Sequence, residues 1–191
     1  MAKLLVIDNY DSFTYNLVQM FKLYDLSIHV KRSDDLTLDD AKKIDPDYIL
    51  ISPGPKSPTH SGISVPLILE FYKKIPVLGV CLGMQCINEA FGGRTIKAEI
   101  PVHGKISEVR HTGNGIFKNI PESFNAARYH SLVVERKNGD LVETAHTGSI
   151  VMGFQHKTET LYGVQFHPES FMTEYGEKII ENFLNKGVLK A

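Results

Sequence analysis

The segment Gly79-Val80-Cys81-Leu82-Gly83 has the residue types of a tight turn that presents a nucleophile. An apolar run precedes it and a helical pattern follows it, as in the G-x-nucleophile-x-G turn, with cysteine in place of serine. Glycines remove steric clashes in such a strained turn, and a helix N-terminus favours the thiolate. The amide of Leu82 would then be one donor of an oxyanion hole. The alternative interpretation is a buried cysteine in a glycine-rich turn.

A thiolate nucleophile needs a base, and the chain has eight histidines. We single out His167 because it stands in the segment Gln165-Phe166-His167-Pro168-Glu169-Ser170. Residues two apart in an extended chain project to the same side, so Glu169 is expected beside His167. A carboxylate in that place sets the tautomer of the imidazole and supports its protonated form. The alternative is a histidine that ends a strand, followed by a solvated acid.

Two further polar segments follow or enter apolar runs. In Ser52-Pro53-Gly54-Pro55, the rigid prolines would present the N–H of Gly54 as a second oxyanion donor. The commoner meaning of a Pro-Gly pair is an ordinary tight turn. The stretch Tyr129-His130-Ser131-Leu132 enters an apolar run and indicates little when taken alone.

The elements that must position these residues alternate through the first half of the chain. Short apolar runs predict strands at 4–7, 27–31, 48–51 and 77–80. Helical patterns lie between them, with caps offered at Asp11, Ser12 and Thr37 and an apolar face expected from Val65, Ile68, Leu69 and Tyr72. This alternation predicts a parallel sheet covered on both faces, which binds ligands beyond the carboxyl ends of its strands. Asp8, Ser52 and Cys81 all follow predicted strands.

The second half of the chain has a different pattern. Short β-type runs occur at 105–109, 132–134, 150–154 and 162–166. A last helix is expected to bury Ile179, Ile180, Phe183 and Leu184 and to end at Gly187. We therefore predict one α/β domain over residues 1–191. Its open, mainly parallel sheet would be flanked by helices and extended by antiparallel strands in the second half.

Composition limits the classes of function. The 191 residues carry a net charge of -1, which gives no electrostatic reason to expect nucleic acid or an anionic membrane as a partner. No apolar run is long enough to span a membrane, and the N-terminus does not have the pattern of a signal peptide. The two cysteines, Cys81 and Cys86, would face different ways on a helix, so the default expectation is a reducing cytoplasm. No metal-ligand or nucleotide-phosphate motif occurs, and we expect neither a metal nor a cofactor.

Together and in this order, the four polar segments resemble the class I (triad) glutamine amidotransferases over the whole chain. The opening run from Asp8 to Leu17 is similar to the amidotransferase subunits of anthranilate synthase and aminodeoxychorismate synthase. The resemblance implies a triad of Cys81, His167 and Glu169, and oxyanion amides at Gly54 and Leu82. It also implies that glutamine contacts Gly54, Pro55, Lys56, Gln85, Ser131 and Leu132.

One residue departs from the pattern of that family. The family loop often reads Pro-Gly-Pro-Gly, and here Lys56 replaces the last glycine. If the position contributes only its backbone, a lysine does no harm. If the position needs a positive φ, the geometry of the loop is disturbed.

By this resemblance, Cys81 would hydrolyse glutamine through a thioester, and the ammonia would pass to a separate chorismate-using synthase subunit. No cofactor is expected in this chain, and Mg²⁺ is expected only in that partner. The product stays open between anthranilate, for tryptophan, and aminodeoxychorismate, for folate, and one subunit can serve both. The remaining alternatives are a cysteine peptidase or γ-glutamyl hydrolase on a similar scaffold, and a regulatory subunit without activity.

Overall fold

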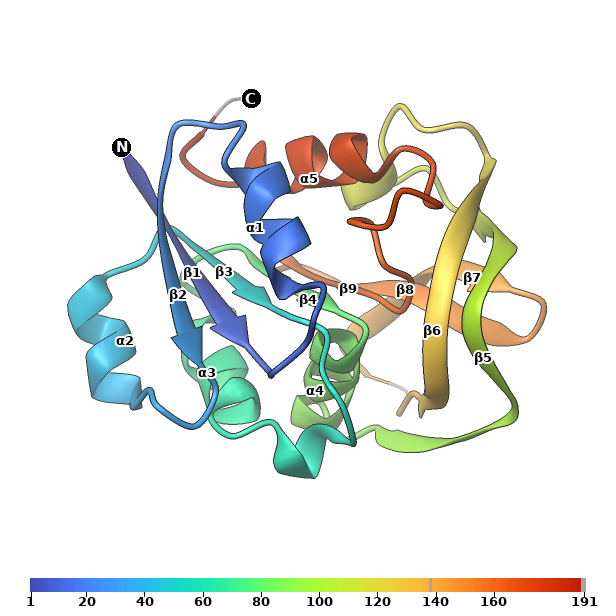
Figure 1. Cartoon of the computed structure of the whole chain (residues 1–191), viewed down its shortest axis with the longest axis horizontal. Coiled ribbons are helices and arrows are strands. Elements are labelled where there is room, and N and C mark those ends of the chain that lie inside the picture. The colour runs from blue at the N-terminus through green and yellow to red at the C-terminus, as the bar shows by residue number, and fades with distance from the viewer. Residues whose placement is uncertain (138, 190–191) are drawn as a thin grey trace.

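The structure is a computed structural model that describes residues 1–137 and 139–189. Within these residues the strands form one nine-stranded sheet in the order β2-β1-β3-β4-β9-β8-β7-β5-β6 (Figure 1). The strands are β1 (Ala2–Asp8), β2 (Leu26–Arg32), β3 (Tyr48–Ile51), β4 (Val77–Val80), β5 (Arg94–His111), β6 (Ser123–Glu135), β7 (Leu141–Thr147), β8 (Ile150–His156) and β9 (Leu161–Val164). The helices are α1 (Thr14–Phe21), α2 (Leu38–Ile44), α3 (Ser64–Phe71), α4 (Leu82–Ala90) and α5 (Gly176–Leu184), with short 3₁₀ helices at Pro58–His60 and Gly115–Phe117.

The sheet has a parallel half and an antiparallel half. Neighbouring strands from β2 to β9 pair in parallel, and those from β9 to β6 pair antiparallel. This arrangement confirms the predicted fold class. The strands predicted at 48–51 and 77–80 have the same bounds as β3 and β4. Both are short runs of fully buried residues, as expected for strands covered on both faces.

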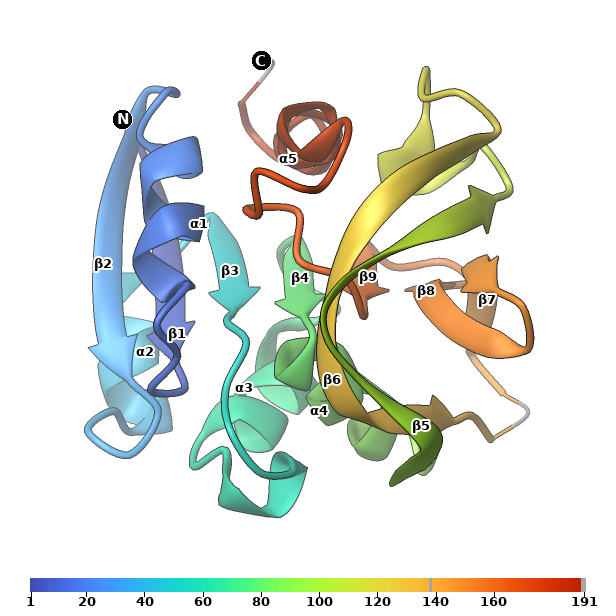
Figure 2. The ribbon, with the colours of Figure 1, turned by 45° about the vertical axis from the view of Figure 1, so that its right-hand side comes forward.

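Helices cover both faces of the parallel half, so each buried strand divides its side chains between two cores. Leu4 and Val6 of β1 belong to the core under α1 and α5, whereas Leu5 and Ile7 belong to the core under α2, α3 and α4. Figure 2 shows these two groups of helices on opposite sides of the sheet. The alternation follows from the period of two along a strand. The carboxyl ends of the strands are left uncovered by this packing.

Two details of the predicted helices need correction. The face expected for the third helix is wrong, because α3 buries Leu67, Ile68 and Phe71 while Leu69 is 50% exposed. Apolar residues surround this helix, so their spacing did not select one face. The first helix begins at Thr14 without a side-chain cap. The carboxylate of Asp11 accepts the N–H of Phe13 in the turn before that helix instead.

Other predictions about the helices are confirmed. Thr37 and Asp40 form a capping box at the start of α2. The four apolar residues expected to be buried in the last helix, which are Ile179, Ile180, Phe183 and Leu184, have no exposed surface in α5. Tyr48 of β3 donates its hydroxyl to the carbonyl of Leu184 at 2.8 Å. The last helix is thereby anchored to the centre of the sheet.

The antiparallel half is built around a long hairpin. The short runs predicted at 105–109 and 132–134 are parts of β5 and β6, which are 18 and 13 residues long. Figure 2 shows this hairpin as a curved ribbon that leaves the plane of the parallel strands. The sequence did not predict β7, whose buried and exposed positions do not alternate regularly. The curvature of the hairpin carries Tyr129 of β6 against His167, with ring centroids 5.1 Å apart. None of the helices in the described part of the chain is long and apolar enough to cross a membrane.

Candidate active site

Cys81 lies at the sharp turn between β4 and α4. Its backbone is in a strained conformation with φ 53° and ψ -102°, and its N–H donates to the carbonyl of Val164 at 2.8 Å. The flanking glycines are required by close packing. A Cβ on Gly79 would lie 2.5 Å from the backbone of Gly83, and one on Gly83 would lie 2.3 Å from the carbonyl oxygen of Ile51. The turn therefore holds the cysteine at the N-terminus of α4, as the sequence pattern predicts.

His167 and Glu169 form a buried pair in the segment that follows β9. Nδ1 of His167 donates to Oε1 of Glu169 at 2.6 Å, and the two side chains are 3% and 0% exposed. Among the described residues, Nε2 of His167 has no hydrogen-bond partner. Burial alone would lower the pKa of His167, but hydrogen bonds and charges at Cys81 and Glu169 outweigh it and raise that pKa to about 10. The imidazolium form is therefore favoured beside the cysteine.

Two aromatic rings hold the imidazole in place. Phe13 and Tyr129 both meet the ring of His167 edge to face, with centroids 5.7 and 5.1 Å away. The two aromatic rings also contact each other, with centroids 5.3 Å apart. Sequence reasoning missed this role for both residues. Phe13 lies in the opening run that carries the resemblance, and Tyr129 lies in the polar stretch that was uninformative alone.

The Pro-Gly loop after β3 packs against the first residue of α4. A Cβ on Gly54 would lie 2.6 Å from Cβ of Asn9 and 2.7 Å from Cδ2 of Leu82. Asn9 anchors this loop, because its N–H donates to Oγ of Ser52 at 2.9 Å and its side-chain amide donates to the carbonyl of Ser52 at 3.1 Å. The N–H of Leu82 is in the first turn of α4 and has no acceptor within the helix. The structure thus brings Gly54 and Leu82 together, and Asn9 is a supporting residue that the sequence did not reveal.

The remaining residues implied to contact glutamine fall into two groups. Gln85 is buried one turn after Cys81, and its Nε2 lies 3.5 Å from the carbonyl of Leu132 on β6. Ser131 is exposed on β6 next to that residue. Pro55 and Lys56 are exposed in the loop after Gly54. The structure therefore shows a contact between Gln85 and Leu132 across more than 40 positions of sequence.

Lys56 adopts a left-handed conformation with φ 66°, which answers the question that its sequence raised. A non-glycine residue costs about 1–2 kcal/mol there, part of which glycine would return through its greater freedom in the unfolded chain. We expect Lys56→Gly to raise the free energy of unfolding by about 0.5–1 kcal/mol, as measured by urea denaturation. The control is Lys22→Gly. Lys22 has φ -65° at the end of α1, so the same change should lower stability there. A loss of stability in Lys56→Gly would contradict this prediction.

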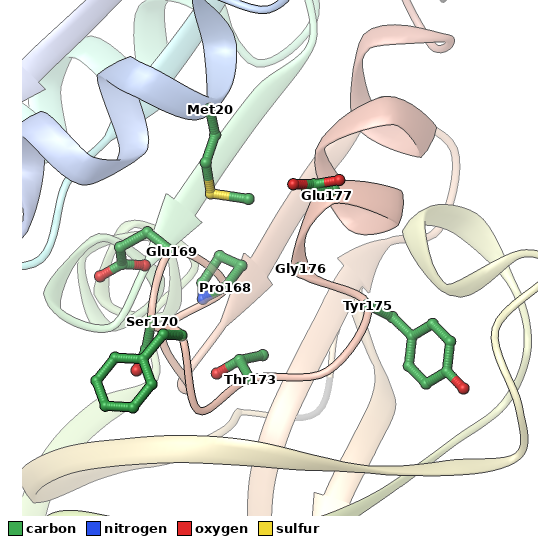
Figure 3. A pocket seen from close by; sticks show the side chains of 9 residues that line it. Met20, Pro168, Glu169, Ser170, Thr173, Tyr175, Gly176 and Glu177 are labelled. Atoms are coloured by element: carbon green, nitrogen blue, oxygen red, sulfur yellow. The ribbon is translucent and has the colours of Figure 1, made fainter.

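A separate pocket lies behind the triad segment, between Glu169 and the start of α5 (Figure 3). Met20 of α1 and Glu177 of α5 also line it. Neither Cys81 nor His167 contributes to this lining. The nucleophile therefore does not open into this pocket. In the part of the chain that the structure describes, no three His, Cys, Asp or Glu side chains are grouped as metal ligands would be.

Comparison with protein-family models gives a match to the class-I glutamine amidotransferases over residues 5–186. The chain belongs to this family. It is 47% identical to anthranilate synthase component 2 of Thermus thermophilus over 186 residues, which cover 95% of this chain and 91% of that protein. It is 44% identical to aminodeoxychorismate synthase component 2 of Serratia marcescens over 190 residues, which cover 96% and 100%.

A solved structure supports the same family. The crystal structure of a putative GMP synthase protein from Thermoplasma acidophilum superposes with a TM-score of 0.85 at 27% identity, covering 96% of this chain and 92% of that one. The predicted resemblance to class I glutamine amidotransferases is confirmed. Within such an amidotransferase, a cysteine at a helix N-terminus beside a buried imidazolium is suited to nucleophilic attack on a carbonyl carbon.

Proposed function

We propose that this chain is the glutamine-hydrolysing subunit of a chorismate-using synthase, with anthranilate synthase as the first candidate. The observation that carries the proposal is the His167–Glu169 pair, which is 2.6 Å long and acts on the cysteine of the turn. The names of the similar proteins support it, because they are components of anthranilate synthase and aminodeoxychorismate synthase. A peptidase or a regulatory subunit has no comparable support.

In the proposed mechanism, the thiolate of Cys81 attacks the side-chain amide carbon of glutamine. The imidazolium of His167 then gives its proton to the leaving nitrogen, so that ammonia departs and a glutamyl thioester remains. Neutral His167 next takes a proton from water, and the resulting hydroxide attacks the thioester. Collapse of this second intermediate releases glutamate and restores the cysteine. Glu169 keeps Nδ1 of the imidazole protonated and stabilises its positive charge throughout.

The other site residues bind the substrate in this proposal. The amides of Gly54 and Leu82 stabilise the oxyanion of both tetrahedral intermediates. Glutamine contacts Gln85, Ser131 and Leu132 on one side and the loop of Gly54, Pro55 and Lys56 on the other. None of these steps uses a cofactor. Mg²⁺ would be needed only by the synthase subunit, and the complex would work in the cytoplasm.

An exposed aromatic residue marks where the synthase subunit would dock. Phe171 is 96% exposed two positions after Glu169. Aromatic side chains of this kind are typical anchors of protein interfaces. A partner seated there would also reach the oxyanion loop, and a shift of about 1 Å in such a loop can change the rate by roughly 10²-fold. We therefore propose that the partner activates the glutaminase.

The test is glutamine hydrolysis by the isolated chain, by the chain with its synthase subunit captured from the native host, and by that complex with chorismate. We expect kcat/KM to rise at least about tenfold in the complex. Values equal within twofold would leave a constitutive glutaminase without activation. Absence of hydrolysis in every sample would overturn the proposed function itself. The product formed by the complex separates anthranilate synthase from aminodeoxychorismate synthase, the second candidate supported by the relative from Serratia marcescens.

A further inference from the structure

The side chain of Gln165 lies against the sulfur of Cys81. Gln165 has no exposed surface, and its backbone N–H donates to the carbonyl of Met152 at 2.9 Å, which fixes the residue beside β8. Its Nε2 lies 3.4 Å from Sγ of Cys81. An N–H group that donates to an ionisable atom favours the charged form of that atom. The orientation of this amide therefore matters for the nucleophile.

Contacts on the other side of the amide settle that orientation. The carbonyl of Leu132 can only accept, so the atom of Gln85 that lies 3.5 Å from it must be Nε2. The same Nε2 lies 3.3 Å from Oε1 of Gln165. With its oxygen held by this donor, Gln165 must turn its own Nε2 towards the sulfur. The flipped amide would place two donors against each other and an acceptor against the thiolate.

The far end of the same network begins at Arg128, which can only donate. Nε of Arg128 donates to Nε2 of His130 at 3.0 Å, and Nη1 donates to Oγ of Ser107 at 3.1 Å. Nδ1 of His130 must then carry the hydrogen, and it donates to the carbonyl of Leu132 at 2.9 Å. Burial first, and then the charge of Arg128, lowers the pKa of His130 to about 4. The neutral ring that this arrangement needs is therefore stable at neutral pH.

These contacts form one directed chain, here called the Arg128–Gln165 relay, which consists of Arg128, His130, the carbonyl of Leu132, Gln85 and Gln165. Arg128 at one end and the Leu132 carbonyl in the middle allow only one direction for its donors. We infer that Gln165 stabilises the thiolate of Cys81 through its amide N–H, and that the relay behind it positions this amide. This inference rests on the proposed function, because it concerns the nucleophile of the same site.

Other groups also act on the sulfur and must be kept apart in a test. The titratable and charged groups packed around Cys81 and the relay are His167 and Glu169 after β9, His130 and Arg128 on β6, His103 on β5, and Cys86 and Glu89 on α4. A change at Gln165 leaves all of them in place. Burial raises the pKa of the Cys86 thiol to about 12, so alkylation near neutral pH reports on Cys81.

The experiment measures the alkylation of Cys81 by iodoacetamide against pH, followed by peptide mass spectrometry. In Gln165→Met, which keeps the length of the side chain and removes the donor, the pH midpoint of the rate should rise by about one unit. This corresponds to a roughly tenfold lower rate at pH values below both midpoints. His130→Phe, which breaks the relay three links away, should shift the midpoint in the same direction by less. Gln155→Met on β8 is the matched control and should not shift it.

The outcomes separate the inference from the proposed function. An unchanged midpoint in folded Gln165→Met, with glutamine hydrolysis intact in the parent chain, would overturn the inference alone. If Gln165→Met does not fold, Gln165→Asn decides, because its shorter amide withdraws the donor and should give the same shift. A parent chain that neither hydrolyses glutamine with its partner nor alkylates faster at Cys81 than a simple thiol would overturn the proposed function.

Discussion

Replacing Cys81 by serine is expected to lower glutamine-dependent synthesis by the complex at least about 10⁴-fold and to leave synthesis from added ammonium unchanged. The nucleophile is in this chain, whereas the chemistry on chorismate belongs to the partner in the proposed function. A hydroxyl has a much higher pKa than a thiol, so the imidazole beside it no longer yields a ready nucleophile. The measurement compares product formation by the purified complex with glutamine and with ammonium as nitrogen donor.

Cys86→Ser is the matched control for this prediction. Cys86 is also buried on α4, but its sulfur contacts the hydroxyl of Ser61 and is not part of the site. Any cost of that change should appear in stability, with both nitrogen donors still used. Equal loss of the two activities in Cys81→Ser would mean that Cys81 supports the complex structurally, and it would contradict the proposed role.

The parts of the fold that the sequence predicted well are those determined by local rules. The bounds of β3 and β4 agree to the residue because each is a short apolar run that ends at a proline, a glycine turn or the nucleophile segment. The face of α3 was wrong because apolar residues surround that helix, and only the packing against α4 selects Leu67 and Phe71. The strand β7 was missed because its pairing with β5 and β8 determines it more than its own pattern does.

The candidate site divides along the same line. Cys81, Gly54 and the His167–Glu169 pair were predicted because turn chemistry and a spacing of two residues are visible in short segments. Residues that act across long stretches of sequence were not predicted. Asn9 holds a loop 43 positions away, and Gln165 reaches a sulfur 84 positions away. Both residues stand in segments that carry the resemblance, but only the register of the strands brings them to the loop and the sulfur.

Glu169→Gln is expected to lower kcat for glutamine hydrolysis by roughly 10²–10⁴-fold, less than the loss in Cys81→Ser. The amide oxygen can still accept from Nδ1 of His167, so the ring keeps its tautomer, but the negative charge is gone. That charge helps to raise the pKa of His167 to about 10. Without it the imidazolium loses its proton at lower pH, and the alkaline limb of the kcat/KM profile should move towards neutrality.

The profile of kcat/KM against pH for glutamine distinguishes this role from a structural one. The control is Glu177→Gln, a matched change in the exposed start of α5 across the pocket of Figure 3. It should leave both the rate and the profile unchanged. A Glu169→Gln chain that folds and keeps full kcat would show that the carboxylate does not orient or charge the base. A lower rate with an unmoved alkaline limb would mean that Glu169 acts on the position of the imidazole and not on its protonation.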